Sequence, residues 1–197
     1  RAFGAAPSGA EGTTFNILKG LDWAAVQGAR IINLSFAGPS DPLLARALAA
    51  LHRRGTIVIA AVGNAGPRSP PLYPAADATV IAVTATDPED RLFAQANRGP
   101  HVTVAAPGVD ILAPAPGGAY QAQSGTSFAA AYVSGIVALL IERRPRLNGE
   151  VAKRVLQQSA KDLGPRGRDE QFGAGLADAH SAILSLPTDS PGAARAR

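Results

Sequence analysis

Apolar residues return along the chain at two different spacings, which predict an alternation of helices and buried strands. Over residues 13–28 they recur every three or four positions and stop at Gly28, which predicts a helix capped by Thr13 or Thr14. The β-prone residues 31–36 then predict a strand that ends at a turn.

The same alternation repeats further along the chain. Residues 40–42, Ser-Asp-Pro, form a helix start, and residues 43–51 carry one apolar face before Gly55. Residues 56–62 are almost wholly apolar, as in a strand that is covered on both faces. Strands separated by helices imply a parallel sheet with right-handed crossovers. The sequence therefore predicts the α/β class, with three layers and a mostly parallel central sheet flanked by helices.

Further elements follow from the same rules. The remaining predicted strands cover residues 79–84 and 102–105, and the remaining predicted helices cover 127–141, 148–160 and 178–184. Segments dense in Pro, Gly, Ala or Ser are predicted as loops at residues 5–12, 67–74 and 107–118.

Length and composition indicate one globular domain. The chain has 197 residues, of which 46% are hydrophobic and 17% charged, which excludes disorder along its whole length. We expect a domain over residues 1–186 and a flexible tail over 187–197, where the residues are small and polar. The chain has no Met, even at position 1, so we expect it to be part of a longer or processed protein.

Charge and cysteine content exclude several classes of function. The net charge is +4, but the basic residues lie in clusters too short to follow a phosphate backbone, so no nucleic-acid partner is expected. The absence of cysteine excludes disulfides, thiolate zinc sites and a cysteine nucleophile. The longest apolar run, residues 128–141, is interrupted by Ser134 and Gly135, so no membrane helix is expected.

Candidate chemistry lies where ligands collect in a parallel sheet, at the carboxyl ends of strands and the helix starts that follow. Three segments fall there: residues 33–39, 60–66 and 123–129. In the last of these, a Gly-Thr-Ser turn opens onto an apolar helix and places the hydroxyl of Ser127 near unpaired backbone amides. The alternative is that Ser127 or Thr126 simply caps the helix.

Asn64 lies between two glycines directly after the strand predicted at residues 56–62. Its carboxamide is able to donate a hydrogen bond to an oxyanion, and the glycines let a substrate backbone approach. The alternative is an ordinary turn. In residues 33–39, Ser35 and Gly38 either line a cleft or only end a strand.

Taken in this order, the three segments resemble those of the subtilisin-like serine peptidases, the subtilases. Residues 125–135, GTSFAAAYVSG, are similar to the family pattern Gly-Thr-Ser-x-Ala-x-Pro-x-Val-x-Gly, with Ala131 in place of the proline. Residues 60–66 are similar to the segment that carries the family's oxyanion-hole asparagine, and residues 33–39 to the strand that lines its specificity pocket. The resemblance extends from residue 1 to about residue 184.

The resemblance implies a serine endopeptidase that hydrolyses peptide bonds through an acyl-enzyme. Ser127 is then the nucleophile, and Asn64 forms the oxyanion hole together with the backbone amide of Ser127. The residues implied in substrate binding are Ser35, Phe36, Ala37, Gly38, Gly63, Gly125 and Thr126. The family often has glycine at the position of Ala37, and the methyl group of Ala37 is expected to narrow the entrance of the specificity pocket.

The Asp and His of the family's catalytic triad are missing from the matching positions. None of His52, His101 and His180 stands in a Gly-Thr-His context, and each is expected to be an ordinary surface or core histidine. We expect the Asp and His to lie in a segment upstream of this chain, which alone is then not competent, because a serine without a base is a poor nucleophile.

The same resemblance implies a peptide or protein substrate, secretion or a place in the cell envelope, and an upstream segment of the same domain as a partner. No cofactor or catalytic metal is expected. Structural calcium occurs in the family, but the acidic clusters at residues 87–90 and 169–170 form no recognisable ligand loop. Two alternatives remain: an inactive subtilase-like pseudoenzyme or interaction module, and a nucleotide- or anion-binding protein that uses the helix start at Ser127. Against the second, no phosphate-binding glycine motif is present.

Overall fold

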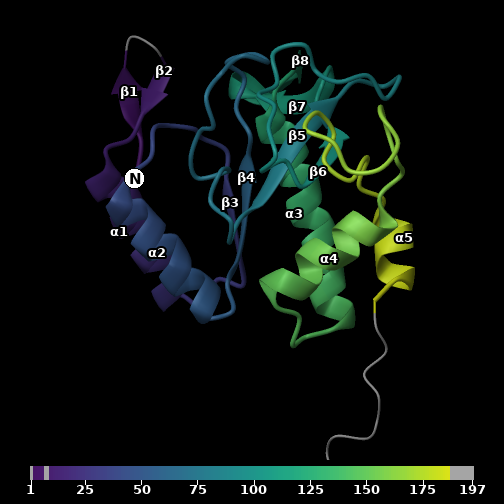
Figure 1. Ribbon diagram of the computed structural model, residues 1–197. Coiled ribbons are helices and arrows are strands. Elements are labelled where there is room, and N and C mark those ends of the chain that lie inside the picture. The colour runs from purple at the N-terminus through teal and green to yellow at the C-terminus, as the bar shows by residue number, and fades with distance from the viewer. Residues whose placement is uncertain (1, 7–8, 187–197) are drawn as a thin grey trace, which may run out of the picture.

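The computed structural model describes residues 2–6 and 9–186 and has a central sheet between two groups of helices (Figure 1). The sheet consists of four parallel strands in the order β3-β4-β5-β6. Their bounds are Ile31–Leu34 for β3, Ile57–Ala61 for β4, Ile81–Thr86 for β5 and Val104–Pro107 for β6. The three-layer α/β fold expected from the sequence is confirmed.

One face of the sheet carries α1, Thr14–Val26, and α2, Pro42–Arg53. Both helices start where the sequence predicts. The hydroxyl of Thr13 accepts a hydrogen bond from a backbone N–H in the first turn of α1, and the carboxylate of Asp41 accepts two in the first turn of α2. The buried leucines of these helices pack against the strand side chains on this face.

The other face carries α3, Thr126–Arg143, with α4, Gly149–Ser159, and α5, Ala179–Leu184, next to it. Helix α3 contacts all four strands of the sheet. Strand β4 is buried along its whole length because it is covered on both sides. Ile57 and Ile59 pack in the core with α3, whereas Val58 and Ala60 pack in the core with α2. Each large apolar side chain buried in this way stabilises the fold by about 1.5–3 kcal/mol.

Two segments predicted as loops are β-hairpins, so the prediction of irregular structure there is wrong. Strands β1, Gly4–Ala6, and β2, Gly9–Glu11, pair antiparallel within the predicted loop 5–12. Strands β7, Ile111–Ala115, and β8, Ala119–Gln123, pair antiparallel after Pro107. Gly117 and Gly118 have φ of 81° and 78° in the connection between β7 and β8, a backbone that glycine adopts without strain.

The two outer strands of the sheet differ in what lies beside them. Next to β6, Ala105 donates a hydrogen bond to Gly175 and accepts one from Ala177, each of 2.8 Å, so residues 174–177 cover that edge. On the opposite side, β3 pairs only with β4 within residues 2–6 and 9–186. The sheet therefore has an open edge at β3. The expected tail, residues 187–197, lies outside the described residues.

Helix α3 has the length and composition of a membrane span, contrary to the expectation that no stretch of the chain does. It has 18 residues and a mean hydropathy of 1.3. A helix at the centre of a protein core passes the same test, and α3 packs along the sheet and against α5. This packing explains the buried apolar residues of α3, whereas Tyr132 and Leu139 on the same helix are 50% and 43% exposed.

Candidate functional site

The structure brings the three predicted segments together at the carboxyl edge of the sheet. The chain leaves β3 at Ser35 and β4 at Val62, and α3 starts beside both exits. The hydroxyl of Ser35 donates a hydrogen bond of 3.3 Å to the backbone oxygen of Ser127. Asn64 contacts Thr126 directly. Ser127 therefore lies where the two loops meet.

Ser127 is half-buried in the first turn of α3. The helix is capped at Gly125, whose backbone is extended, and no side chain bonds to the cap. Neither Ser127 nor Thr126 is therefore used as a helix cap. Within the described part of the chain, the hydroxyl and the backbone N–H of Ser127 have no hydrogen-bond partner. The partial positive charge of the helix start favours negative charge on a group bound there.

The carboxamide of Asn64 is held in one orientation by Thr126. Its Oδ1 accepts hydrogen bonds from the backbone N–H and the hydroxyl of Thr126, at 3.0 and 2.9 Å. The Thr126 hydroxyl in turn accepts a bond of 3.2 Å from the N–H of Gly63, and Thr126 is fully buried. Because the oxygen is engaged, the Nδ2 donor of Asn64 remains available to a ligand.

Gly125 lies directly beside that donor. A Cβ at Gly125 would lie 3.3 Å from the Nδ2 of Asn64 and 3.9 Å from the backbone nitrogen of Ser127. The Nδ2 of Asn64 and the N–H of Ser127 thus flank the same small space, which a side chain at position 125 would fill. Two donors beside one space are the arrangement that stabilises an oxyanion.

Of the predicted substrate-binding residues after β3, Phe36, Ala37 and Gly38 line a cavity of about 340 Å³, whereas Ser35 does not. Gly38 exchanges two backbone hydrogen bonds of 2.8 Å with Tyr73, which fixes the end of this segment. The rings of Phe3 and Phe36 lie 5.2 Å apart between centroids and form an apolar wall. The cavity is lined by Phe3, Glu11, Gly12, Thr14, Ile17, Phe36, Ala37, Gly38, Pro39, Ser40, Asp41, Leu44 and Tyr73.

Asp41 gives this cavity a negative charge. The hydroxyl of Thr14 donates to its carboxylate at 2.6 Å, and the N–H groups of Leu44 and Leu43 donate to it as well. These hydrogen bonds hold the pKa of Asp41 below its ordinary value. The carboxylate is therefore ionised at neutral pH.

The three histidines lie away from these groups. His52, at the end of α2, is 3.7 Å from Glu150 of α4, and His180 lies in α5. His101 lies in the loop before β6, where burial and the charge of Arg168 lower its pKa. In residues 2–6 and 9–186, no hydrogen bond or ion pair joins any of them to Ser127.

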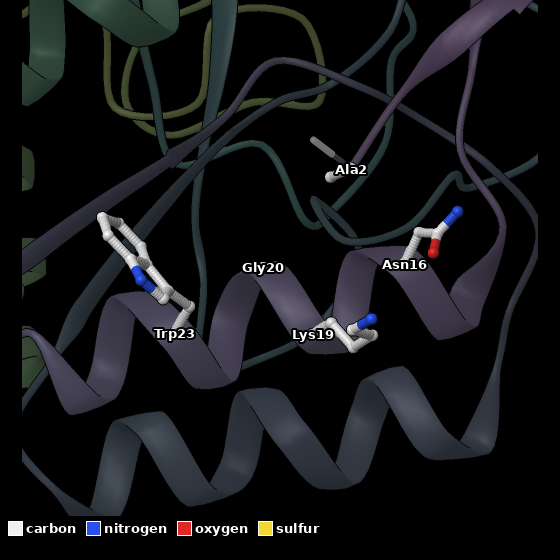
Figure 2. Close-up of a pocket in the computed structure, with 5 residues that line it drawn as sticks. All are labelled: Ala2, Asn16, Lys19, Gly20 and Trp23. Carbon is white, nitrogen blue, oxygen red and sulfur yellow. The ribbon is translucent and has the colours of Figure 1, made fainter.

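A larger hollow, of about 440 Å³, lies along the outer face of α1. Figure 2 shows its lining, in which Asn16, Lys19, Gly20 and Trp23 belong to α1 and Ala2 lies beside that helix. It contains none of the predicted site residues. No charged pair or cluster of polar side chains converges there, so we assign it no chemistry.

The acidic side chains after β5 form ion pairs with basic side chains. Asp87 and Glu89 each lie 2.7 Å from Arg91, and Asp90 lies 2.8 Å from Lys161. Across the described residues, no three acidic, histidine or cysteine side chains gather as a metal site would require.

One buried polar residue of this region was missed from the sequence. Asn97 is 1% exposed, and its side chain bonds to Val62 and Ala65, on both sides of Asn64. A single asparagine in a loop carries no periodic signal, so only the three-dimensional contact identifies it.

Comparisons with known sequences and structures show which proteins this chain is similar to. Residues 3–175 match the subtilase family. Minor extracellular protease Epr of Bacillus subtilis (strain 168) is 35% identical over 162 residues, which are 82% of this chain and 25% of that protein. Subtilisin Savinase of Lederbergia lenta is 34% identical over 172 residues, which are 87% of this chain and 62% of that protein.

The fold is similar to that of fervidolysin from Fervidobacterium pennivorans, a keratinolytic enzyme related to subtilisin. The TM-score is 0.80 at 28% identity, over 88% of this chain and 29% of that one. The chain thus spans less than two thirds of each of these three proteins. The match over nearly all of its own length, together with the fold, shows that this chain belongs to the subtilase family of serine peptidases and covers part of the catalytic domain.

Proposed function

We propose that this chain carries the nucleophile and the oxyanion hole of a serine endopeptidase. The oxygen of Ser127 attacks the carbonyl carbon of a peptide bond, and its proton passes to a histidine base. The carbon–nitrogen bond breaks, the amine leaves with that proton, and an acyl group stays on Ser127. Water then hydrolyses the ester and frees the serine.

The orientation of Asn64 is the observation that carries this proposal. Thr126 engages the Oδ1 of Asn64 with two donors, so the Nδ2 points its hydrogens toward the space beside Gly125 and Ser127. As the carbonyl oxygen of the substrate becomes negative, the Nδ2 of Asn64 and the N–H of Ser127 donate to it. Fixed donors stabilise this charge without having to reorganise during the reaction.

We place the missing histidine and aspartate in a segment upstream that adds to the open edge of β3. A parallel strand added there would end beside the carboxyl end of β3, where Ser35 touches Ser127. Groups at the carboxyl ends of neighbouring parallel strands lie close together. The upstream segment is therefore the partner that completes the site.

The substrate is a peptide or protein, and it lies along residues 35–38. These residues extend from the contact between Ser35 and Ser127 to the cavity beside Phe36. One side chain of the substrate enters the cavity beside Phe36, whose lining includes Ala37. We place the protein outside the cell or in its envelope, in line with the extracellular relative described above.

Reaction with a fluorophosphonate probe tests the proposal in the full-length protein. We expect the probe to label Ser127 and the label to disappear in Ser127→Ala. Ser134→Ala is the matched control, because Ser134 is on the same helix but its hydroxyl donates to the backbone oxygen of Ala130. Labelling there should equal that of the wild type. No labelling of the wild type would overturn the peptidase and favour a pseudoenzyme.

A further inference from the structure

We propose that Asn97 is a positioning residue for the reaction, because its buried side chain sets the position of Asn64. This inference rests on the proposed function. Asn97 belongs to the loop between β5 and β6, and it neither lines the cavity beside Phe36 nor contacts Ser127.

The side chain of Asn97 bonds to the backbone on both sides of Asn64. Its Nδ2 donates to the oxygen of Val62 at 3.0 Å, and its Oδ1 accepts from the N–H of Ala65 at 2.8 Å. Its own backbone N–H donates to the oxygen of Gly63 at 3.0 Å. One residue therefore fixes three backbone groups around Asn64, those of Val62, Gly63 and Ala65.

Apart from Asn97, hydrogen bonds rather than core packing hold this loop: Thr126 bonds to Gly63 and Asn64, and Gly66 donates to the oxygen of Gln95. Asn64 and Ala65 are exposed, so no apolar side chain anchors them in the core. Gly63 has φ of 103°, a conformation in which the chain turns sharply after β4. A Cβ at Gly63 would lie 2.7 Å from the Nδ2 of Asn97, so the glycine also makes room for this contact. The hydrogen bonds of Asn97 therefore require a residue without a side chain at position 63.

Asparagine is the side chain that satisfies both backbone groups at once. It offers one donor and one acceptor on a planar group without charge. Aspartate has no donor for the oxygen of Val62, and alanine leaves both backbone groups without a partner. Because Asn97 is 1% exposed, water does not readily replace the lost bonds.

A shift of Asn64 acts on the reaction through the oxyanion hole. A misplacement of about 1 Å in a reacting geometry costs about 10²-fold in rate. We therefore expect Asn97→Ala to lower kcat by about 10- to 100-fold, with a change in KM of less than about threefold, since residues 35–38 stay in place.

A double-mutant cycle distinguishes positioning from a general loss of stability. If Asn97 acts through Asn64, Asn97→Ala should lower kcat in the wild type but change it by less than about twofold when Asn64 is already alanine. Thr103→Val is the matched control. It removes a fully buried acceptor for the N–H of Ala82, away from the site, and should leave kcat unchanged.

The test is made on the full-length protein with a peptide substrate, below the melting temperature of each variant. Asn97→Asp gives a second variant, which keeps the acceptor for Ala65 but places a buried carboxylate against the oxygen of Val62, so it should also lower kcat. Equal losses of kcat from Asn97→Ala in both backgrounds, or wild-type kcat in Asn97→Ala, would overturn the inference.

Amide hydrogen exchange supplies a readout that does not depend on catalysis. In Asn97→Ala the N–H of Ala65 should exchange at least tenfold faster, whereas that of Ala82 should not change. If the wild type has no peptidase activity but Asn97→Ala still speeds exchange at Ala65, the proposed function is overturned, whereas the role of Asn97 in holding the loop around Asn64 stands. Unchanged exchange at Ala65 in Asn97→Ala would overturn that role of Asn97.

Discussion

The backbone N–H and the hydroxyl of Thr126 both donate to the Oδ1 of Asn64, at 3.0 and 2.9 Å. This pair joins the start of α3 to the loop after β4, so the residue before Ser127 sets the orientation of the carboxamide beside it. The oxygen of Asn64 is used inside the protein, and its nitrogen is left for the substrate.

Asn64→Asp should abolish most of the activity without unfolding the protein. Aspartate keeps an oxygen for Thr126 but has no donor for an oxyanion, and position 64 is exposed, so little core packing is lost. Loss of one oxyanion-hole donor costs about 10²–10³ in turnover, a figure that itself comes from a subtilisin. We expect the same range for Asn64→Asp and Asn64→Ala, measured as kcat on a peptide substrate. Near-normal turnover in either variant would contradict the role of Asn64.

Gly63→Ala should lower the free energy of unfolding by more than about 1 kcal/mol. Alanine is strained at φ of 103°, and its Cβ would meet the side chain of Asn97. Gly135→Ala is the matched control, because a Cβ there meets no atom within 4 Å and alanine favours the helix by about 0.5–1 kcal/mol. Urea unfolding measures both changes. Equal stability of the two variants would show that position 63 tolerates a side chain.

The layers of the fold and the contact of Asn64 with the start of α3 follow from local patterns. Strand β4 is a continuous apolar run, and the carboxyl ends of parallel strands share one edge of a sheet, so the loops after them must approach each other. The hairpin of β7 and β8 was missed because Pro114, Gly117 and Gly118 are typical of loops. Asn97 was missed because its partners lie far from it in the sequence.

His101 should make the protein less stable in mildly acidic solution. Its folded-state pKa lies below 6.5, mainly because of burial and also because of Arg168, although Glu170 acts in the opposite direction. As the pH falls through 6.5, the unfolded chain takes up the proton first, so the free energy of unfolding decreases. This contribution is complete above pH 6.5 and is lost as the pH falls toward the folded-state pKa.

Urea unfolding of the wild type and of His101→Gln at pH 7.5 and pH 5 measures this effect. The two other histidines are present in both proteins, so their contributions cancel. The wild type should lose more stability than the variant between the two pH values. An equal loss in both proteins would mean that His101 has the same pKa in the folded and unfolded chains.

Produced without any further segment, residues 1–197 should self-associate. Among the described residues, β3 pairs on one side only, and α1 exposes Phe15, Trp23 and Val26, each at least 67% accessible. Figure 2 shows the ring of Trp23 standing out from α1. Trp23→Gln should reduce the association measured by sedimentation velocity. Tyr120→Gln is the control, because Tyr120 is 69% exposed but lies on the β7–β8 hairpin. A monomeric wild type that melts cooperatively would contradict the expectation.

The most direct measurement is the crystal structure of the full-length protein after reaction with a fluorophosphonate. We predict that phosphorus is bonded to the oxygen of Ser127 and that the phosphoryl oxygen lies about 2.7–3.1 Å from both the Nδ2 of Asn64 and the backbone nitrogen of Ser127. A phosphoryl oxygen directed away from Asn64, or phosphorus on any other residue, would contradict a shared oxyanion site.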